Sequence, residues 1–232
     1  MQLIAVAAIM GLLSFDVNNP SRLSEALDCA LREARSTAGE DLLLAPLLLN
    51  AARRSGQQPA TFIEIGAFNG INGSNTLIYE RCFGFDGALI EASPPNFEAL
   101  QESNRKGAMV HAAVCSGEGS IKVSTGKVST VAGDMSKMGN THLRRWASER
   151  KGTVSVPCKP LLTLYDDAMA ARRAEKFQRQ PEPQLSPQWN RNQPVTFMSL
   201  DVEGAELDVL QSVPHLDRQP FDVLLVENEY NN

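Results

Sequence analysis

A glycine-rich turn follows an apolar strand-like run in the segment TFIEIGAFNG, and its residue types could bind a small ligand. Gly66 and Gly70 let the backbone turn sharply and approach a ligand closely. Dinucleotide-binding loops carry a glycine where this chain has Phe68, whose phenyl ring would obstruct a pyrophosphate. The carboxylate of Glu64 suits a cationic ligand better than a phosphate. The segment therefore favours S-adenosylmethionine over NAD, and a tight turn with no ligand is the alternative.

A second carboxylate, Glu91, ends the apolar run GALIE and follows Gly66 by 25 residues. At this point of a nucleoside-binding sheet, an acidic residue accepts hydrogen bonds from ribose hydroxyls. Many strands end in glutamate, so Glu91 gains weight only together with the glycine-rich turn. The two features together predict a nucleoside site.

Acidic residues recur further along the chain, in the segment MSLDVEGAELDVL. Asp201 stands where a strand leaves the core, so its carboxylate is expected to face the ligand crevice. Glu206 falls in the first turn of the following helix, where a negative charge complements the helix dipole. A capped junction needs fewer acids than Asp201 and Glu203 provide, which favours a catalytic role. Glu227 ends the last strand in an analogous place and is a weaker catalytic candidate.

Apolar periodicity predicts the elements that must position these side chains. Buried strands alternate with short helices, which is typical of an α/β fold with a doubly wound, mostly parallel sheet. The expected strands are 61–65, 87–91, 108–114, 195–200 and 221–226, and the expected helices are 74–81, 93–105, 161–174 and 205–212. Two short β-like stretches, 120–124 and 153–158, and a charged helix at 142–150 lie between them.

The chain is expected to divide into an N-terminal helical appendage, residues 1–58, and a main domain, residues 59–232. Helices are predicted at 21–36 and 41–56, with Pro46 in the first turn of the second. The polar run at 172–194 predicts an exposed, mobile insertion. A C-terminal antiparallel hairpin is expected after the last strand but does not follow it, which indicates a fragment or a replaced hairpin.

The 232 residues carry a formal net charge of −5, which argues against nucleic acid as a partner. The four cysteines form no CxxC pair, so no zinc or thioredoxin-type site is expected, and buried free thiols are favoured over disulfides. Residues 1–15 have the length of a signal-peptide core but lack its basic start and cleavage site. A cytoplasmic location is favoured, the secretory pathway is the alternative, and no firm membrane association is expected.

Six segments, among them SLDVEGAELDVL, together resemble the FkbM-type methyltransferase family over about residues 60–230. The most specific are FIEIGAFNGINGSNTLIYER and VHAAVCSGEGSIKV. The resemblance implies a Rossmann-like class I methyltransferase fold with S-adenosylmethionine as methyl donor. No metal site is expected. It also implies a hydroxyl acceptor on a sugar or a small natural product. The predicted cofactor-binding residues are Glu64, Gly66, Ala67, Phe68, Gly70, Asn75, Glu91, Ala92, Ser93, Ala113 and Asp201. By position the resemblance assigns catalysis to Asp201 and Glu203, and Glu227 stays the weaker catalytic candidate.

In this interpretation the protein would mainly position the reactants, and Asp201 is the first choice to accept the hydroxyl proton. Two other functions stay open. One is an NAD-dependent oxidoreductase on a similar sheet, against which Phe68 argues. The other is a non-catalytic interaction or trafficking domain that retains the fold, with its pocket closed or filled by side chains. Acceptor specificity would lie in 124–150, in the polar insertion and in the missing C-terminal segment, none of which carries a recognisable motif.

Overall fold

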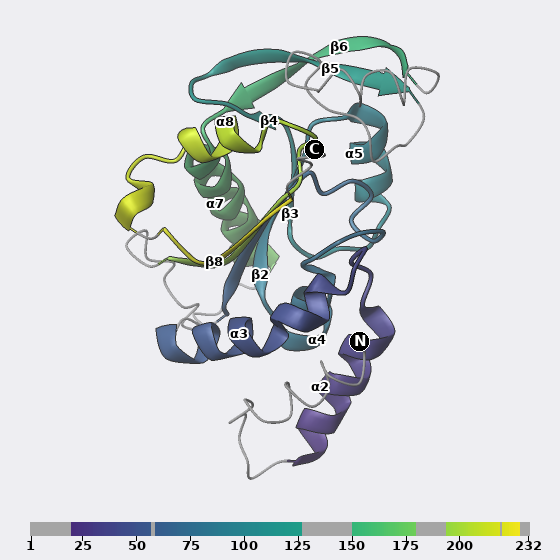
Figure 1. Cartoon of the computed structure of the whole chain (residues 1–232), viewed down its shortest axis with the longest axis vertical. Coiled ribbons are helices and arrows are strands. Elements are labelled where there is room, and N and C mark those ends of the chain that lie inside the picture. The colour runs from purple at the N-terminus through teal and green to yellow at the C-terminus, as the bar shows by residue number, and fades with distance from the viewer. Residues whose placement is uncertain (1–19, 57–58, 127–149, 180–193, 219, 228–232) are drawn as a thin grey trace, which may run out of the picture.

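The computed structural model describes residues 20–56, 59–126, 150–179, 194–218 and 220–227, and they form an α/β fold (Figure 1). Its central sheet has five parallel strands in the order β3-β2-β1-β7-β8. The strands are β1 (Thr61–Ile65), β2 (Asp86–Glu91), β3 (Ala108–His111), β7 (Val195–Leu200) and β8 (Phe221–Val226). The predicted doubly wound parallel sheet is confirmed.

Helices cover both faces of this sheet because its strands are apolar on both sides. One face carries α2 (Pro20–Glu33), α3 (Glu40–Ser55), α4 (Leu77–Phe83) and α5 (Pro94–Gln101), whose apolar side chains pack on Phe62, Leu89 and Phe197. The other face carries α7 (Leu161–Arg179) and α8 (Glu206–Gln211), which pack on Ile63, Ile90 and Met198. A short 3₁₀ helix, η1 (Leu216–Arg218), precedes β8.

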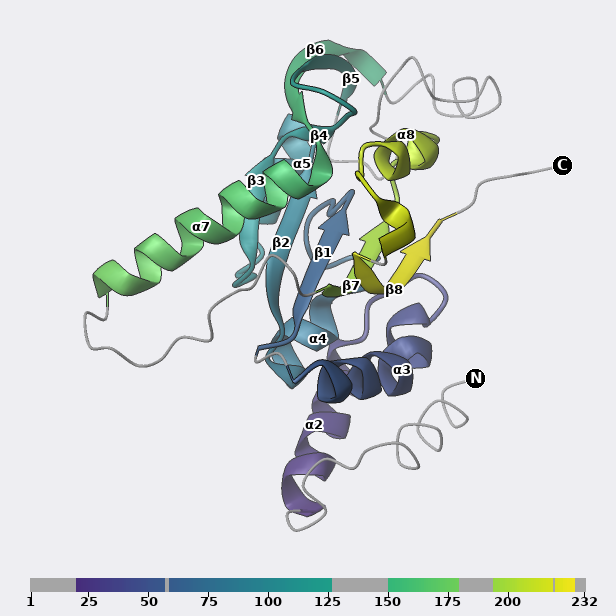
Figure 2. The same ribbon diagram turned by 90° about the vertical axis from the view of Figure 1, so that its left-hand side faces the viewer.

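A smaller sheet of three strands lies at the end of the molecule toward which the central strands run (Figure 2). Its order is β4-β6-β5, where β4 is Ala113–Val114, β5 is Gly119–Gly126 and β6 is Arg150–Lys159. The single strand predicted at 108–114 is therefore wrong. The chain leaves the central sheet after His111, and Ala113 pairs with Cys158 in the second sheet instead.

Several predicted helix boundaries also differ from the structure. The helix that starts at Ser93 ends at Gln101 rather than Arg105, and Pro46 lies inside α3 because that helix begins six residues earlier, at Glu40. The helix predicted to end at 174 continues to Arg179, since the charged residues there are good helix formers. The first residues of the expected insertion are therefore helical, and its remainder, 180–193, lies outside the described residues.

Three further predictions concern segments outside the described residues: the signal-like start at 1–15, the helix at 142–150 up to its last residue, and the region after Glu227. Arg150 itself begins β6. Among the helices that the structure describes, none combines the length and apolar character needed to cross a bilayer.

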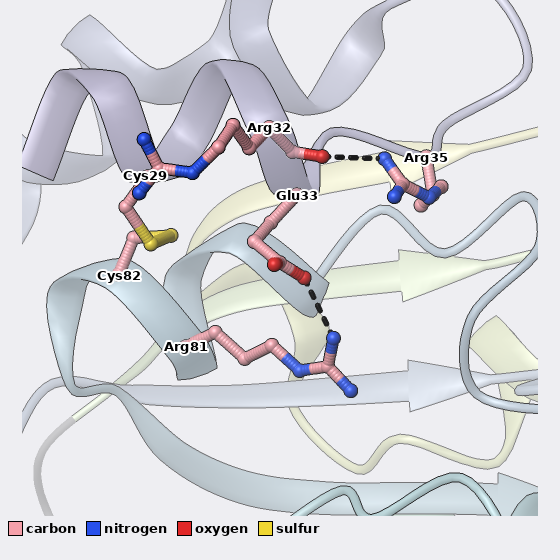
Figure 3. Close-up of a disulfide and its surroundings, with 6 residues drawn as sticks. All are labelled: Cys29, Arg32, Glu33, Arg35, Arg81 and Cys82. Carbon is pink, nitrogen blue, oxygen red and sulfur yellow. Dashed lines mark hydrogen bonds and ion pairs between the residues drawn. A yellow bond between two sulfur atoms is a disulfide. The ribbon is translucent and has the colours of Figure 1, made fainter.

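All four cysteines form disulfides, so the expectation of buried free thiols is wrong. Cys29 on α2 is bonded to Cys82 on α4, and Cys115, just after β4, is bonded to Cys158 on β6. The partners are 53 and 43 residues apart in sequence, but packing of their elements brings each pair of Cα atoms to 5.7 Å. Figure 3 shows the first bridge beside the ion pair of Arg81 and Glu33, which joins the same two helices.

Candidate functional site

A cavity of about 540 Å³ opens at the carboxyl ends of the central strands, where the strand order reverses between β1 and β7. Ligands of doubly wound sheets bind in this crevice, and the volume is within the range of small-molecule sites. The cavity wall includes the turn after β1, the ends of β2, β7 and β8, and residues 112–116 at the start of the smaller sheet.

The turn after β1 is shaped by a close approach to β7. Gly66 has φ +80°, and a Cβ atom added there would lie 1.7 Å from the carbonyl oxygen of Asp201. Backbone hydrogen bonds fix the turn on both sides, from the Gly66 N–H to the Ile90 carbonyl and from the Asp201 N–H to the Ile65 carbonyl, each 3.0 Å. Only glycine fits here, because the position needs both a left-handed backbone and no side chain.

Phe68 also has a left-handed backbone, with φ +49°, which is uncommon for a residue with a side chain. Its N–H donates to Oε2 of Glu91 at 2.8 Å. Glu203, on the opposite wall of the cavity, is a second non-glycine residue with positive φ. Such conformations persist where the surrounding structure holds them, and they gather at binding and catalytic sites.

Glu91 is buried at the end of β2, and its carboxylate faces the cavity. The Phe68 N–H reaches one of its oxygens, and the Ser93 N–H reaches the other at 2.7 Å. Burial raises the pKa of Glu91 to about 7, although these backbone hydrogen bonds oppose the rise. The Asn96 side chain and the Ala92 N–H also hydrogen-bond this carboxylate, so the chain itself fixes its orientation at the cavity wall.

Glu64 lines the cavity as well, but its carboxylate binds its own chain. The Asn75 N–H donates to Oε1, and the hydroxyls of Ser74 and Thr76 donate to Oε2, at 2.9, 2.9 and 2.6 Å. A cation does lie beside it: Nη1 of Arg105 is 3.5 Å from Oε2. Glu64 thus fixes the segment that follows the glycine-rich turn, and its predicted contact with a ligand stays a prediction.

Acidic side chains gather on the wall formed by β7 and β8. Burial, a hydrogen bond with Glu227 and the charges of Glu227, Glu203 and Glu206 raise the pKa of Asp201 to about 9. Although Asp201 is exposed, the surface it presents faces the cavity, where many protein atoms surround it. Glu206 is engaged otherwise, since its Oε1 accepts the N–H groups of Val202 and Gly204.

The structure brings most of the predicted site residues to one cavity. Its lining includes Glu64, Gly66, Ala67, Phe68, Glu91, Ala92, Ala113, Asp201, Glu203 and Glu227. Three predicted residues support the lining from behind: Gly70 packs against Leu100, Ser93 precedes α5, and the Asn75 side-chain amide donates to Ser199 Oγ at 3.1 Å.

The described lining carries six acidic residues and no lysine, arginine or histidine. A cavity whose charged side chains are all acidic attracts a cation and repels a polyanion. No group of three or more histidine, cysteine, aspartate or glutamate side chains in the described part of the chain is arranged to hold a metal ion.

Sequence reasoning missed three residues that hold the site from outside the cavity: Arg105, Glu80 and Thr76. Their side chains are buried and joined by hydrogen bonds below the glycine-rich turn. A single sequence carries little signal for them, because an arginine after a helix and a glutamate within one are usual surface residues.

Comparison with known proteins gives one family and one solved structure. The family model described as the methyltransferase FkbM domain matches residues 64–232. A solved structure, methyltransferase FkbM from Methylobacillus flagellatus KT, is similar with 14% sequence identity and a TM-score of 0.34. The similarity covers 84% of this chain and 45% of that one, so the matched part of this chain spans less than half the length of the solved protein. None of the curated proteins matches the chain.

Proposed function

The chain belongs to the methyltransferase FkbM domain family, and on this premise we propose that it transfers a methyl group from S-adenosylmethionine to a hydroxyl oxygen. The acceptor in this proposal is a small molecule or a glycan. The matched residues, 64–232, contain every predicted site residue and all of the cavity lining except Thr37.

One observation carries the choice of cofactor. The cavity combines the turn at Gly66, a position that only glycine can occupy, with the carboxylate of Glu91 at the end of β2. Backbone N–H groups hold both oxygens of Glu91 in a fixed orientation at the cavity wall, where the carboxylate would accept a ribose hydroxyl. The charged residues of the described lining are all acidic, which suits a ligand that carries a sulfonium and an ammonium group. The residues present therefore fit S-adenosylmethionine, which would be held by Gly66, Phe68 and Glu91.

When bound, S-adenosylmethionine supplies an electrophilic methyl group on a positively charged sulfur. The chain's own contribution would be to orient the acceptor and to take up its proton. Asp201 suits this task, because it faces the cavity at the end of β7 and its raised pKa makes its ionised form a stronger base. A cation beside Asp201 would lower that pKa again and favour the ionised form.

The charge of the cavity also bears on the acceptor. The described lining has six acidic residues and no basic side chain. This charge disfavours an acceptor that is phosphorylated or otherwise anionic, including nucleic acid. A neutral polyhydroxyl molecule, such as a sugar, meets no such repulsion and offers the hydroxyl that the reaction needs.

The two alternatives fit the cavity less well. A dinucleotide would bring a pyrophosphate to the turn where Phe68 stands and to a wall of like charge. A domain with no ligand needs no open cavity, whereas about 540 Å³ is accessible here. Methyl transfer remains the proposal that uses both the turn and the acidic wall.

Calorimetry with S-adenosylhomocysteine, followed by transfer of a labelled methyl group to a panel of neutral glycans and polyols, tests the proposal. We expect micromolar binding and labelling of at least one neutral acceptor. NADH binding without S-adenosylhomocysteine binding would replace this function by the oxidoreductase. Absence of binding by both would favour the interaction domain.

A further inference from the structure

Arg105 is a charged side chain that is fully buried directly below the glycine-rich turn. It follows α5 in sequence and does not line the cavity. A buried guanidinium needs partners for its donors and its charge, because removal from water is costly. Those partners show what the residue holds in place.

One set of partners fixes Arg105 itself. Its Nε donates to Oε1 of Glu80 on α4 at 3.1 Å, and the N–H groups of Lys106 and Gly107 donate to the same carboxylate at 2.8 and 2.9 Å. The guanidinium also lies 5.7 Å from the centre of the Phe62 ring on β1. Arg105 is therefore attached to the rigid core of the fold.

The other set of partners belongs to the turn and the segment after it. Nη1 donates to the Gly70 carbonyl at 2.7 Å and to Ser74 Oγ at 3.1 Å, and Nη2 donates to Thr76 Oγ1 at 2.8 Å. The hydroxyls of Ser74 and Thr76 in turn donate to Glu64 in the cavity wall. A planar fork with several fixed donors can make all these contacts, whereas a lysine ammonium cannot.

We propose that Arg105 is a positioning residue for the cofactor half of the site: it fixes the glycine-rich turn and, through Ser74 and Thr76, the carboxylate of Glu64. The identity of the ligand in this proposal rests on the proposed function. The effect of Arg105 on the geometry of the turn is independent of it. Without the fork, the turn loses its fixed geometry and the cavity wall loses the shape that a bound cofactor would require.

Two variants test the proposal. Arg105→Lys keeps the positive charge and removes the fork. Thr76→Val keeps the volume and removes the hydroxyl between Arg105 and Glu64. In each, we expect amides of residues 66–76 to exchange hydrogen at least about tenfold faster, and S-adenosylhomocysteine to bind about tenfold more weakly. Thr76→Ser restores the hydroxyl and should recover most of the affinity.

Arg81→Lys is the matched control, because Arg81 pairs with Glu33 on the surface and touches neither the turn nor the cavity. It should change neither quantity. Unchanged exchange of the turn in folded Arg105→Lys and Thr76→Val would overturn the proposal. If the unmutated protein binds no S-adenosylhomocysteine, the proposed function fails, and hydrogen exchange still decides the role of Arg105. If Arg105→Lys does not fold, Thr76→Val decides it.

The disulfides carry a second inference independently. All four cysteines are paired, in two bridges that join different parts of the fold, α2 to α4 and β4 to β6. Cytosolic thiols are kept reduced, and stable structural disulfides form in oxidising compartments. We infer that the chain folds in such a compartment, so its acceptor would be met there or outside the cell.

Thiol trapping tests the second inference. Cells that naturally produce the chain are lysed in N-ethylmaleimide, and the mass of the intact protein is measured before and after reduction. We expect no label before reduction and four labels after it. Labelling of either cysteine pair before reduction would overturn the inference.

Discussion

The two walls of the cavity use carboxylates in opposite ways. On the wall built by β1 and β2, Glu64 and Glu91 accept hydrogen bonds from the chain itself, and Arg105 adds a positive charge. On the wall built by β7 and β8, Asp201 and Glu227 face each other among further acids, and the pKa of Asp201 rises. The first wall is fixed in shape, whereas the second retains electrostatic repulsion that a cation or a proton would relieve.

This difference suits two separate roles in the proposed function, ligand recognition by the first wall and proton exchange by the second. A wall whose acceptors are held by backbone donors can recognise a rigid ligand without reorganising. A wall with crowded carboxylates holds a proton more tightly than an ordinary aspartate does, so it can exchange one with an acceptor. Four changes, from the largest expected effect to the smallest, can break or sharpen the comparison.

Gly66→Ala should have the largest effect, because the two walls touch at this residue. The new Cβ would overlap the Asp201 carbonyl, and the backbone has positive φ. We expect a loss of at least about 3 kcal/mol in the free energy of unfolding, measured with urea, and no detectable S-adenosylhomocysteine binding. Gly84→Ala is the matched control: φ is +71° there but nothing lies within 4 Å, so only about 1 kcal/mol should be lost. Equal losses would mean that the walls do not depend on this contact.

Glu91 predicts a pH dependence for the first wall. Its pKa is raised from 4.5 to about 7, so its stabilising contribution is complete below pH 4.5 and is lost as the pH rises through about 7. Under the proposed function, ligand affinity should change in the opposite direction, because the ionised form of Glu91 would accept the ribose hydroxyls. We expect S-adenosylhomocysteine to bind about tenfold more weakly at pH 6 than at pH 8 by calorimetry. Glu91→Gln should remove this dependence, and an identical pH profile in that variant would exclude Glu91 as its source.

Asp201→Asn should remove the cost of keeping a protonated aspartate on the second wall. The pKa of Asp201 is raised from 3.8 to about 9, so the protein loses stability as the pH rises across that interval. At pH 8 the variant should unfold about 2 °C higher than the unmutated protein in a thermal scan, and at pH 4 the difference should vanish. Methyl transfer should fall while S-adenosylhomocysteine binding persists. Full transfer by the variant would remove Asp201 from the mechanism.

Glu33→Gln should have the smallest effect. Its ion pair with Arg81 is partly exposed and lies beside the Cys29–Cys82 bridge (Figure 3). Neither residue of the pair lines the cavity. We expect a loss of less than about 0.5 kcal/mol in the free energy of unfolding, measured with urea, and unchanged ligand affinity. A larger effect on affinity would show that the packing of α2 on α4 controls the first wall.

The sequence predicts the sheet and both walls because their signals are local. Runs such as FIEI and ALIE are apolar apart from one glutamate each, as strands covered on both faces must largely be. Parallel strands bring their carboxyl ends to one edge of the sheet. Glu91 and Asp201 could thus be placed in one crevice before the structure.

Other features depend on contacts between distant segments and could not be predicted. The pairing of Cys29 with Cys82 follows from the packing of α2 on α4, and no spacing rule reveals it. The division of 108–114 between two sheets depends on β6, which lies some 40 residues later. Arg105 finds its partners between Phe62 and Glu80, so its role emerges only in three dimensions.

The two disulfides also divide the covalent structure into two closed rings, residues 29–82 and 115–158, joined by the single stretch 83–114. A protease that cuts one peptide bond inside either ring leaves a molecule of unchanged mass, apart from one added water, until it is reduced. A cut in 83–114 releases two pieces at once. The first ring contains β1 and the whole glycine-rich turn, so a nick there would go unnoticed on a non-reducing gel even where the turn itself had been broken.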